Sequence, residues 1–285
     1  MMKNKILVIC TLVHLLLLKY KDDIEYLPLS NEATDASWEK LLLKYQPTAI
    51  VFGLQAIDEN KLSLWRKLKP DDDLKFVRKG TSMHRVDFAA AKKYNINVLN
   101  IPGVNAPFVA RFISDILLTD NNQNTTIAIL GVGEIGRLVT RKVITARQHV
   151  LLYSRTHYSF DGNHYSYSND LLNIFTCAEQ VAICLPLNDA TKGIIAAEHI
   201  HALPKNTEIV CVSPPRVMSA SAIVALDHRD DITVVFDHVA SGMQFIEESL
   251  SRNQLRPGFT FAERAASSDE CQGAMGEAAI VSAMS

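Results

Sequence analysis

Residues 126–136 read TIAILGVGEIG. An apolar run of strand character leads directly into Gly131, and Gly133 and Gly136 complete a G-x-G-x-x-G pattern ahead of a predicted helix over residues 137–145. In such a turn the first glycine allows the tight bend, the second lets the backbone approach a pyrophosphate, and the third lets helix and strand pack closely. The phosphates would lie at the positive end of the helix dipole. We therefore predict a dinucleotide site that includes Glu134 and Ile135; a turn without a ligand is the alternative.

On both sides of this segment, short apolar runs alternate with helix-like stretches. The predicted strands before it cover residues 49–52, 75–77 and 97–100, and the predicted helices cover 60–68, 87–94 and 107–118. Further predicted strands cover residues 150–153, 180–184, 209–212 and 233–236. Alternation of this kind favours parallel β-α units and an α/β fold. The polar stretch at 120–124 is typical of a surface connection.

The N-terminus resembles a secretory signal, because Lys3 and Lys5 precede an apolar run over residues 6–18. His14 interrupts the run, and no small-x-small cleavage motif follows it. We therefore favour a buried strand over residues 5–10 followed by a helix over 12–21.

Charge and cysteine content exclude several classes of protein. The 285 residues carry a formal net charge of −2, with none of the basic surplus that nucleic-acid binding requires. The 5 cysteines are odd in number and form no C-x-x-C pair, so neither a disulfide framework nor a metal site is expected. We expect a cytoplasmic protein that binds neither nucleic acid nor a membrane.

The end of the second strand of a dinucleotide-binding unit distinguishes NAD from NADP, because an acidic residue about 20 positions after the glycines binds the ribose 2′-hydroxyl of NAD. Here this place is taken by Ser154, Arg155 and Thr156. Arg155 can form charge-assisted bonds to a 2′-phosphate, with the two hydroxyls as further donors. We predict NADP(H) as cofactor; an arginine that is only solvated on a loop is the alternative.

Several further motifs together resemble the D-isomer-specific 2-hydroxyacid dehydrogenases, which include glyoxylate and hydroxypyruvate reductases. They are Arg78-Lys79-Gly80 through Val86-Asp87, Ala89-Ala90-Ala91, residues 100–105 (NIPGVN), the glycine motif, Leu185-Pro186-Leu187 with Thr191, and residues 234–237 (VVFD). The resemblance implies a Rossmann dinucleotide-binding domain over residues 107–262, inserted in a flavodoxin-like substrate domain of residues 1–106 to which 263–285 return. It also implies an active site in the cleft between them. Cofactor contacts are implied at Leu185, Pro186, Thr191, Val212 and Asp237.

The chain departs from this family at the three catalytic positions. The family's substrate-binding arginine is matched by Pro214, its glutamate by Gly242 and its histidine by Glu263. Replacement candidates are Arg216, which follows a Pro-Pro turn, and His238, His84 and Glu263 as proton donors. For Arg216 a position on the surface without a catalytic role is an equal alternative. For each histidine a structural or solvent-exposed role is favoured over a catalytic one. Glu263 would need burial to raise its pKa.

These residues leave more than one function open. The leading hypothesis is an NADP(H)-dependent oxidoreductase that reduces a small carbonyl or imine compound with a non-standard acid/base set. The alternative is a catalytically silent NADP(H)-binding sensor or scaffold, and a binding module without a dinucleotide is a remote third. The family's dimerisation arm is also reduced to residues 119–125, so we expect a monomer or a dimer through another surface.

Overall fold

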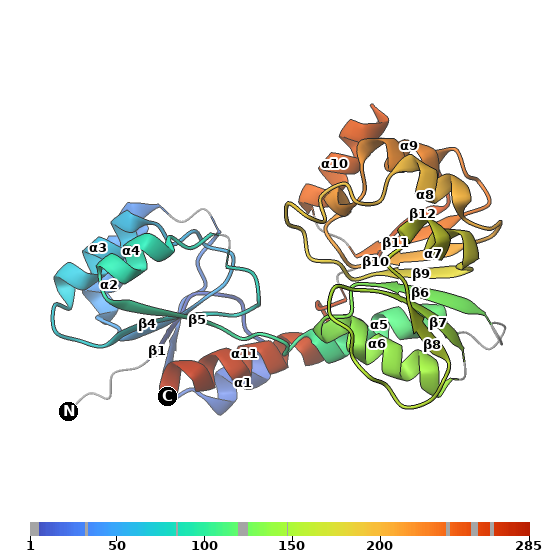
Figure 1. The fold of residues 1–285 in the computed structure, drawn as a ribbon. Helices are drawn as coiled ribbons and strands as arrows, with labels where there is room; N and C mark the ends of the chain where they lie inside the picture. Colours follow the sequence, from blue (N-terminus) through green and yellow to red (C-terminus); the bar gives the residue numbers. More distant parts are fainter. Residues whose placement is uncertain are drawn as a thin grey trace. The chain divides into compact units, whose positions relative to one another are not determined.

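The computed structural model describes residues 6–31, 34–83, 85–118, 125–146, 148–237, 240–251, 256–262 and 265–285, without the side chains of 240 and 241. The chain divides into two compact units (Figure 1). Unit 1 comprises Met1–Asn105 and Ser268–Ser285, and unit 2 comprises Ala106–Ser267. Their assignment to substrate and cofactor, with boundaries after residues 106 and 262, stays a prediction.

Unit 2 contains a parallel sheet of seven strands in the order β12-β11-β10-β9-β6-β7-β8. The strands are β6 (Thr126–Leu130), β7 (His149–Tyr153), β8 (Tyr165–Tyr167), β9 (Gln180–Ile183), β10 (Glu208–Cys211), β11 (Thr233–Asp237) and β12 (Phe259–Ala262). The chain leaves β6 toward β7 and β8 and then crosses to β9 on the other side of β6. This reversal is the topological switch point of a Rossmann fold, where open α/β sheets bind their ligands.

Helices cover both faces of this sheet (Figure 1). One face carries α5 (Ala106–Leu117) and α6 (Glu134–Thr145); the other carries α7 (Leu171–Cys177), α8 (Ala197–Ala202), α9 (Ala220–Asp227) and α10 (Ala240–Leu250). Alternate residues of β6 enter different cores: Ile127 and Ile129 pack with α5 and α6, whereas Ala128 and Leu130 pack with α7 to α10. Burial on both faces explains why the strand is apolar throughout.

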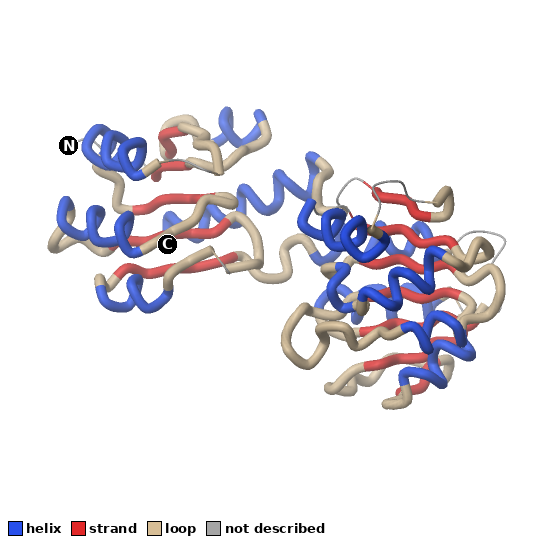
Figure 2. Tube along the Cα trace, turned by 90° about the horizontal axis from the view of Figure 1, so that it is seen from above, coloured by secondary structure: helices blue, strands red, loops and turns tan. Residues whose placement is uncertain are grey.

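Unit 1 has a five-stranded parallel sheet in the flavodoxin-like order β2-β1-β3-β4-β5. Figure 2 shows the strands of each unit in red, lying side by side. The strands of unit 1 are β1 (Ile6–Val8), β2 (Ile24–Tyr26), β3 (Ala49–Phe52), β4 (Leu74–Arg78) and β5 (Ile96–Asn100). One face carries α2 (Asp35–Tyr45), α3 (Glu59–Leu68) and α4 (Phe88–Lys93), and the other carries α1 (His14–Lys19) and α11 (Asp269–Met284) (Figure 1). The strand predicted over residues 5–10 is confirmed over β1, whose residues are all buried. Among the described residues, no helix is long and apolar enough to cross a membrane.

The C-terminal helix α11 is tied to the sheet of unit 1 by Lys79, which follows β4. Its Nζ donates to the Thr11 carbonyl oxygen at 2.5 Å and to Gln272 Oε1 at 2.8 Å. Burial lowers the pKa of this ammonium group. A segment from the end of the chain thereby becomes part of a domain built largely from its beginning.

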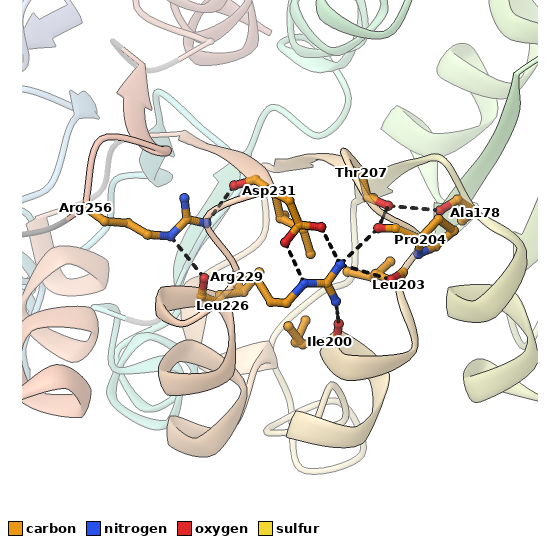
Figure 3. Close-up of polar contacts among 10 residues, drawn as sticks. Ala178, Ile200, Leu203, Pro204, Thr207, Leu226, Arg229, Asp231 and Arg256 are labelled. Atoms are coloured by element: carbon orange, nitrogen blue, oxygen red, sulfur yellow. Dashed lines mark hydrogen bonds and ion pairs between the residues drawn. The ribbon is translucent and has the colours of Figure 1, made fainter.

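An arginine network fixes the loops at the amino ends of β10 and β11 (Figure 3). The Arg229 guanidinium donates to the carbonyl oxygens of Ile200, Leu203 and Pro204 and binds Asp231 with two bonds of 2.8 Å. Arg256 donates to the carbonyl oxygens of Leu226 and Ile232. These charge-assisted bonds tie backbone carbonyl groups of several loops to two side chains, and they hold the end of the sheet opposite the carboxyl ends of its strands.

Candidate functional site

A pocket of about 370 Å³ lies at the carboxyl ends of β6, β7 and β9. Its described lining combines the turn after β6, the end of β7 with the chain that follows, and the segment after β9. The lining residues are Gly131, Val132, Gly133, Tyr153, Ser154, Arg155, Thr156, Tyr158, Cys184, Leu185, Pro186, Ala190, Thr191 and Ile194. The pocket therefore lies at the switch point of the sheet of unit 2.

The three glycines of the turn have different surroundings, which match the roles expected of them. Gly131 has a φ of +95°, and a β-carbon built on it would lie 2.7 Å from the Cys184 carbonyl oxygen. A β-carbon on Gly136 would lie 2.0 Å from the Gly131 carbonyl oxygen. A β-carbon on Gly133 would meet nothing within 4 Å, although this residue lines the pocket. Two glycines are thus required for packing, and the third leaves open space where a pyrophosphate can approach the backbone.

Helix α6 begins directly after Gly133 and presents its positive end to this space. Glu134 in the first turn forms an ion pair with Arg137, three residues further along the helix. The Glu134 side chain is 66% exposed and that of Arg137 is 29% exposed. The arginine thereby offsets the negative charge of a carboxylate in the first turn of α6.

The segment after β7 gives the pocket its polar character. Ser154, Arg155 and Thr156 line it together, so the residues predicted to bind a 2′-phosphate lie beside the glycine turn. Among the described lining residues Arg155 is the one cation, and none carries a carboxylate. Charge and hydroxyl donors of this kind suit a phosphate group.

The segment after β9 closes the apolar side of the pocket with Leu185 and Pro186. Thr191 holds this segment in its turn: its hydroxyl donates to the Pro186 carbonyl oxygen and accepts a hydrogen bond from the Asn188 N–H at 2.9 Å. Burial raises the pKa of the Cys184 thiol, in the lining of the pocket, to about 12. This thiol is therefore neutral at physiological pH and acts as an apolar surface.

Other residues of the predicted cofactor set are absent from the described lining of the pocket: Glu134, Ile135, Gly136, Val212 and Asp237. The Val212 N–H donates to the Ile183 carbonyl oxygen at 3.1 Å. Asp237 Oδ1 accepts a hydrogen bond from the Ala265 N–H at 2.9 Å, which fixes the chain after β12. Their contacts with a cofactor stay predictions.

Of the four catalytic candidates, Arg216 is described, whereas His84, His238 and Glu263 lie outside the described residues. Arg216 belongs to the 3-10 helix η1 (Pro215–Val217), and its guanidinium carbon lies 4.7 Å from the centre of the Phe245 ring of α10. Next to it, Gly242 packs so closely on Pro215 that an added β-carbon would lie 2.7 Å from the proline Cδ. The position that the resemblance matches to the family's glutamate therefore has no room for a side chain.

Part of the lining was not predicted from the sequence: Val132, Tyr153, Tyr158, Cys184, Ala190 and Ile194. Most of these residues are close chain neighbours of predicted ones, so extending each predicted segment by a few residues would have found them. Tyr158 belongs to the long connection between β7 and β8, where the sequence has no periodic pattern that indicates a direction.

Comparison with known proteins agrees with this architecture. The family model of the D-isomer specific 2-hydroxyacid dehydrogenase NAD binding domain matches residues 112–245. A curated relative, erythronate-4-phosphate dehydrogenase of Blochmanniella floridana, is 26% identical over 168 residues, which cover 55% of this chain and 45% of the relative. The match thus spans less than half of that protein's length.

Solved structures resemble the fold along nearly the whole chain. The structure of D-2-hydroxyisocaproate dehydrogenase has a TM-score of 0.78 at 12% identity and covers 97% of this chain and 94% of its own. NAD⁺-bound 3-phosphoglycerate dehydrogenase of Entamoeba histolytica has a TM-score of 0.73 at 19% identity and covers 98% and 94%. Residues 112–245 thus match the NAD-binding domain of the D-isomer specific 2-hydroxyacid dehydrogenases, and the resemblance to this family expected from the sequence motifs is confirmed.

Proposed function

We propose that the pocket of unit 2 binds a nicotinamide dinucleotide and prefers NADP(H) to NAD(H). One observation supports this proposal: the open turn at Gly133 lines the same pocket as Ser154, Arg155 and Thr156. No carboxylate occurs in the described lining of this pocket. Gly133 and the start of α6 would hold the pyrophosphate, and Arg155 with its two neighbouring hydroxyls would hold the 2′-phosphate.

Titration of NADPH and NADH by calorimetry or nicotinamide fluorescence tests this preference. We expect tighter binding of NADPH, and we expect Arg155→Ala to lose most of the difference, since a charge-assisted bond contributes about 1.5–3 kcal/mol. Arg141→Ala is the matched control, because Arg141 is an exposed arginine of the same unit outside the pocket. Equal affinities of the wild type, or an unchanged preference in Arg155→Ala, would contradict the proposal.

For the reaction, we propose an NADP(H)-dependent oxidoreductase that reduces a small carbonyl or imine compound. The match of residues 112–245 to a dehydrogenase NAD-binding domain and the pocket beside the glycine turn support this proposal. A bound nicotinamide supplies hydride chemistry; the protein must hold the acceptor and move a proton. We keep Arg216 as carboxylate-binding candidate and His238, His84 and Glu263 as proton-donor candidates.

A substrate panel tests this part. We expect no robust turnover of glyoxylate, hydroxypyruvate or pyruvate, because Pro214 cannot bind a carboxylate as an arginine does. Turnover of another aldehyde, ketone or imine, followed by the absorbance of NADPH, would support the proposal. Loss of that turnover in Arg216→Ala or a His238 variant would assign the roles.

The packing of Gly242 on Pro215 favours a second candidate, a catalytically silent NADP(H)-binding sensor or scaffold. The contact excludes an acidic side chain at 242 while the cofactor pocket keeps its form. NADPH binding without turnover on a broad panel would favour this candidate over the first.

We further propose a cytoplasmic protein that acts on a small molecule and is a monomer or a dimer through a surface other than the family's arm. The 5 free cysteines support a reducing compartment. Residues 119–124, most of the shortened arm, lie outside the described residues. Light scattering at micromolar concentration tests the oligomeric state, and a dimer centred on residues 119–125 would contradict this proposal.

A further inference from the structure

Tyr158 is an aromatic residue of the pocket wall that lies beyond the predicted phosphate-binding segment. It belongs to the connection between Tyr153, the last residue of β7, and Tyr165, the first of β8. Tyr158 lines the pocket, and the residue is 36% exposed. A large aromatic ring that stays partly open to solvent beside a cofactor pocket is a ready surface for a flat ligand group.

The loop that carries the Tyr158 ring is held in place, because Tyr167 in β8 forms hydrogen bonds to the Tyr158 backbone. The Tyr167 hydroxyl accepts a hydrogen bond from the Tyr158 N–H at 2.9 Å and donates to the Tyr158 carbonyl oxygen at 3.2 Å. The His157 ring stacks on the Tyr167 ring with centres 4.0 Å apart and planes 14° apart. Tyr165 secures the next part of the loop, since its hydroxyl accepts from the Phe160 N–H at 3.2 Å. A loop fixed in this way loses little freedom when a ligand binds.

Arg137 joins this ring to the phosphate-binding end of α6. Its guanidinium carbon lies 4.9 Å from the centre of the Tyr158 ring, and the same group forms the ion pair with Glu134. Its buried Nε has no hydrogen-bond partner among the described residues. The cation therefore supports the ring while it offsets the negative charge at the start of the helix.

We propose that Tyr158 is a cofactor-binding residue that contacts the adenosine half of the dinucleotide, and that Tyr167 and Arg137 are its positioning residues. The inference rests on the proposed binding of a dinucleotide in this pocket. Tyr158 lies four residues after Ser154 in the chain and lines the same pocket as the predicted 2′-phosphate site, which belongs to the adenosine half. Aromatic faces bind nucleobases by stacking, and Tyr158 is the aromatic residue of this loop in the described lining of the pocket.

Calorimetric titration of the full chain with 5′-ADP, 2′,5′-ADP and NADPH tests the inference. We expect Tyr158→Leu to weaken all three by about ten-fold, equal to about 1.4 kcal/mol. Tyr158→Phe and Tyr158→Trp should retain binding, because the ring rather than the hydroxyl makes the contact. Tyr167→Phe keeps an aromatic ring but removes both bonds to the Tyr158 backbone, so it should also weaken all three ligands. Tyr94→Phe is the control, because Tyr94 lies in unit 1 and its hydroxyl binds Glu59.

The outcomes separate this inference from the proposed function. A wild type that binds none of the three ligands overturns both. A wild type that binds them, with Tyr158→Leu binding equally well, overturns the role of Tyr158 and leaves dinucleotide binding intact. Weaker binding in Tyr158→Leu alone, with Tyr167→Phe unchanged, overturns the positioning role. If thermal unfolding shows that Tyr167→Phe does not fold, the role of Tyr158 is decided by comparing Tyr158→Leu, which should bind more weakly, with Tyr158→Phe, which should retain binding.

Discussion

Gly242 lies against the ring of Pro215: a β-carbon on this glycine would come within 2.7 Å of the proline Cδ and 2.8 Å of its Cγ. The next residue of η1, Arg216, lies over Phe245 one turn further along α10. The 3-10 helix and α10 therefore pack at two successive points. The close packing of the Pro-Pro turn depends on the glycine, and that of the glycine on the turn. Pro214 of this turn and Gly242 stand where the family resemblance places a catalytic arginine and a catalytic glutamate.

We expect Gly242→Ala to destabilise the protein by about 1–3 kcal/mol, because the added methyl group must displace η1 or α10. Thermal or denaturant unfolding measures this change. In the double variant with Pro215→Ala the cost of the methyl group should fall, since the opposing ring is gone; strict additivity of the two single changes would contradict the contact. Gly242→Glu should be less stable still and should not create a dehydrogenase.

The glycines of the turn should separate folding from binding. Gly133→Ala should unfold at the wild-type temperature, because its β-carbon meets nothing within 4 Å, yet bind NADPH at least about ten-fold more weakly. Gly136→Ala should be destabilised by about 3 kcal/mol or more, since its β-carbon would lie 2.0 Å from a carbonyl oxygen. Unfolding curves and NADPH titrations of both variants test the pair. A stable Gly136→Ala, or a Gly133→Ala with full affinity, would refute the roles assigned to them.

The sequence predicted the central strands well because burial on both faces makes them apolar throughout. β6 and β3 have the predicted bounds, Thr126–Leu130 and Ala49–Phe52. The same property explains the omissions. The edge strands β8 and β12 are partly exposed and lack a continuous apolar run, so nothing in the sequence indicated them.

Part of the pocket was predictable for a topological reason. In a parallel sheet the carboxyl ends of neighbouring strands meet at one edge, so the turn at Gly131 and the residues after β7 had to lie close together. Tyr158 was not predictable, because its place depends on two hydrogen bonds from a hydroxyl in the next strand. Contacts of that kind arise from tertiary structure and leave no period in the sequence.

The thiols should differ sharply in reactivity. Cys177 is exposed, whereas burial raises the pKa of Cys10 to about 11 and those of Cys184 and Cys211 to about 12. Burial also raises the pKa of Cys271. Since the thiolate is the nucleophile, we expect a disulfide reagent at about pH 8 to modify one thiol rapidly in the native protein. Cys177→Ser should abolish this fast phase, and unfolding of the wild type should release all 5 thiols. A second fast phase in Cys177→Ser would show that a buried thiol is accessible.

The pair of Arg229 and Asp231 should make stability depend on acid pH. Two hydrogen bonds of 2.8 Å from the guanidinium hold the pKa of the Asp231 carboxyl well below its ordinary value. A carboxyl whose pKa is lower in the folded than in the unfolded chain stabilises the fold above its unfolded pKa of about 3.9. That contribution is lost progressively as the pH falls below about 5 toward the folded pKa.

We therefore expect Asp231→Asn to be less stable than the wild type at neutral pH, by up to about 1 kcal/mol because the pair is partly exposed to solvent. The difference should shrink as the pH falls below about 5, because the unfolded wild-type chain then binds a proton that the folded Asp231 carboxyl does not. Unfolding temperatures at a series of pH values measure both effects. Asp161→Asn is the control, because Asp161 is exposed and lies outside the arginine network, so its curve should follow the wild type. A difference between Asp231→Asn and the wild type that stayed constant down to low pH would show that the asparagine acts through packing and not through the loss of charge.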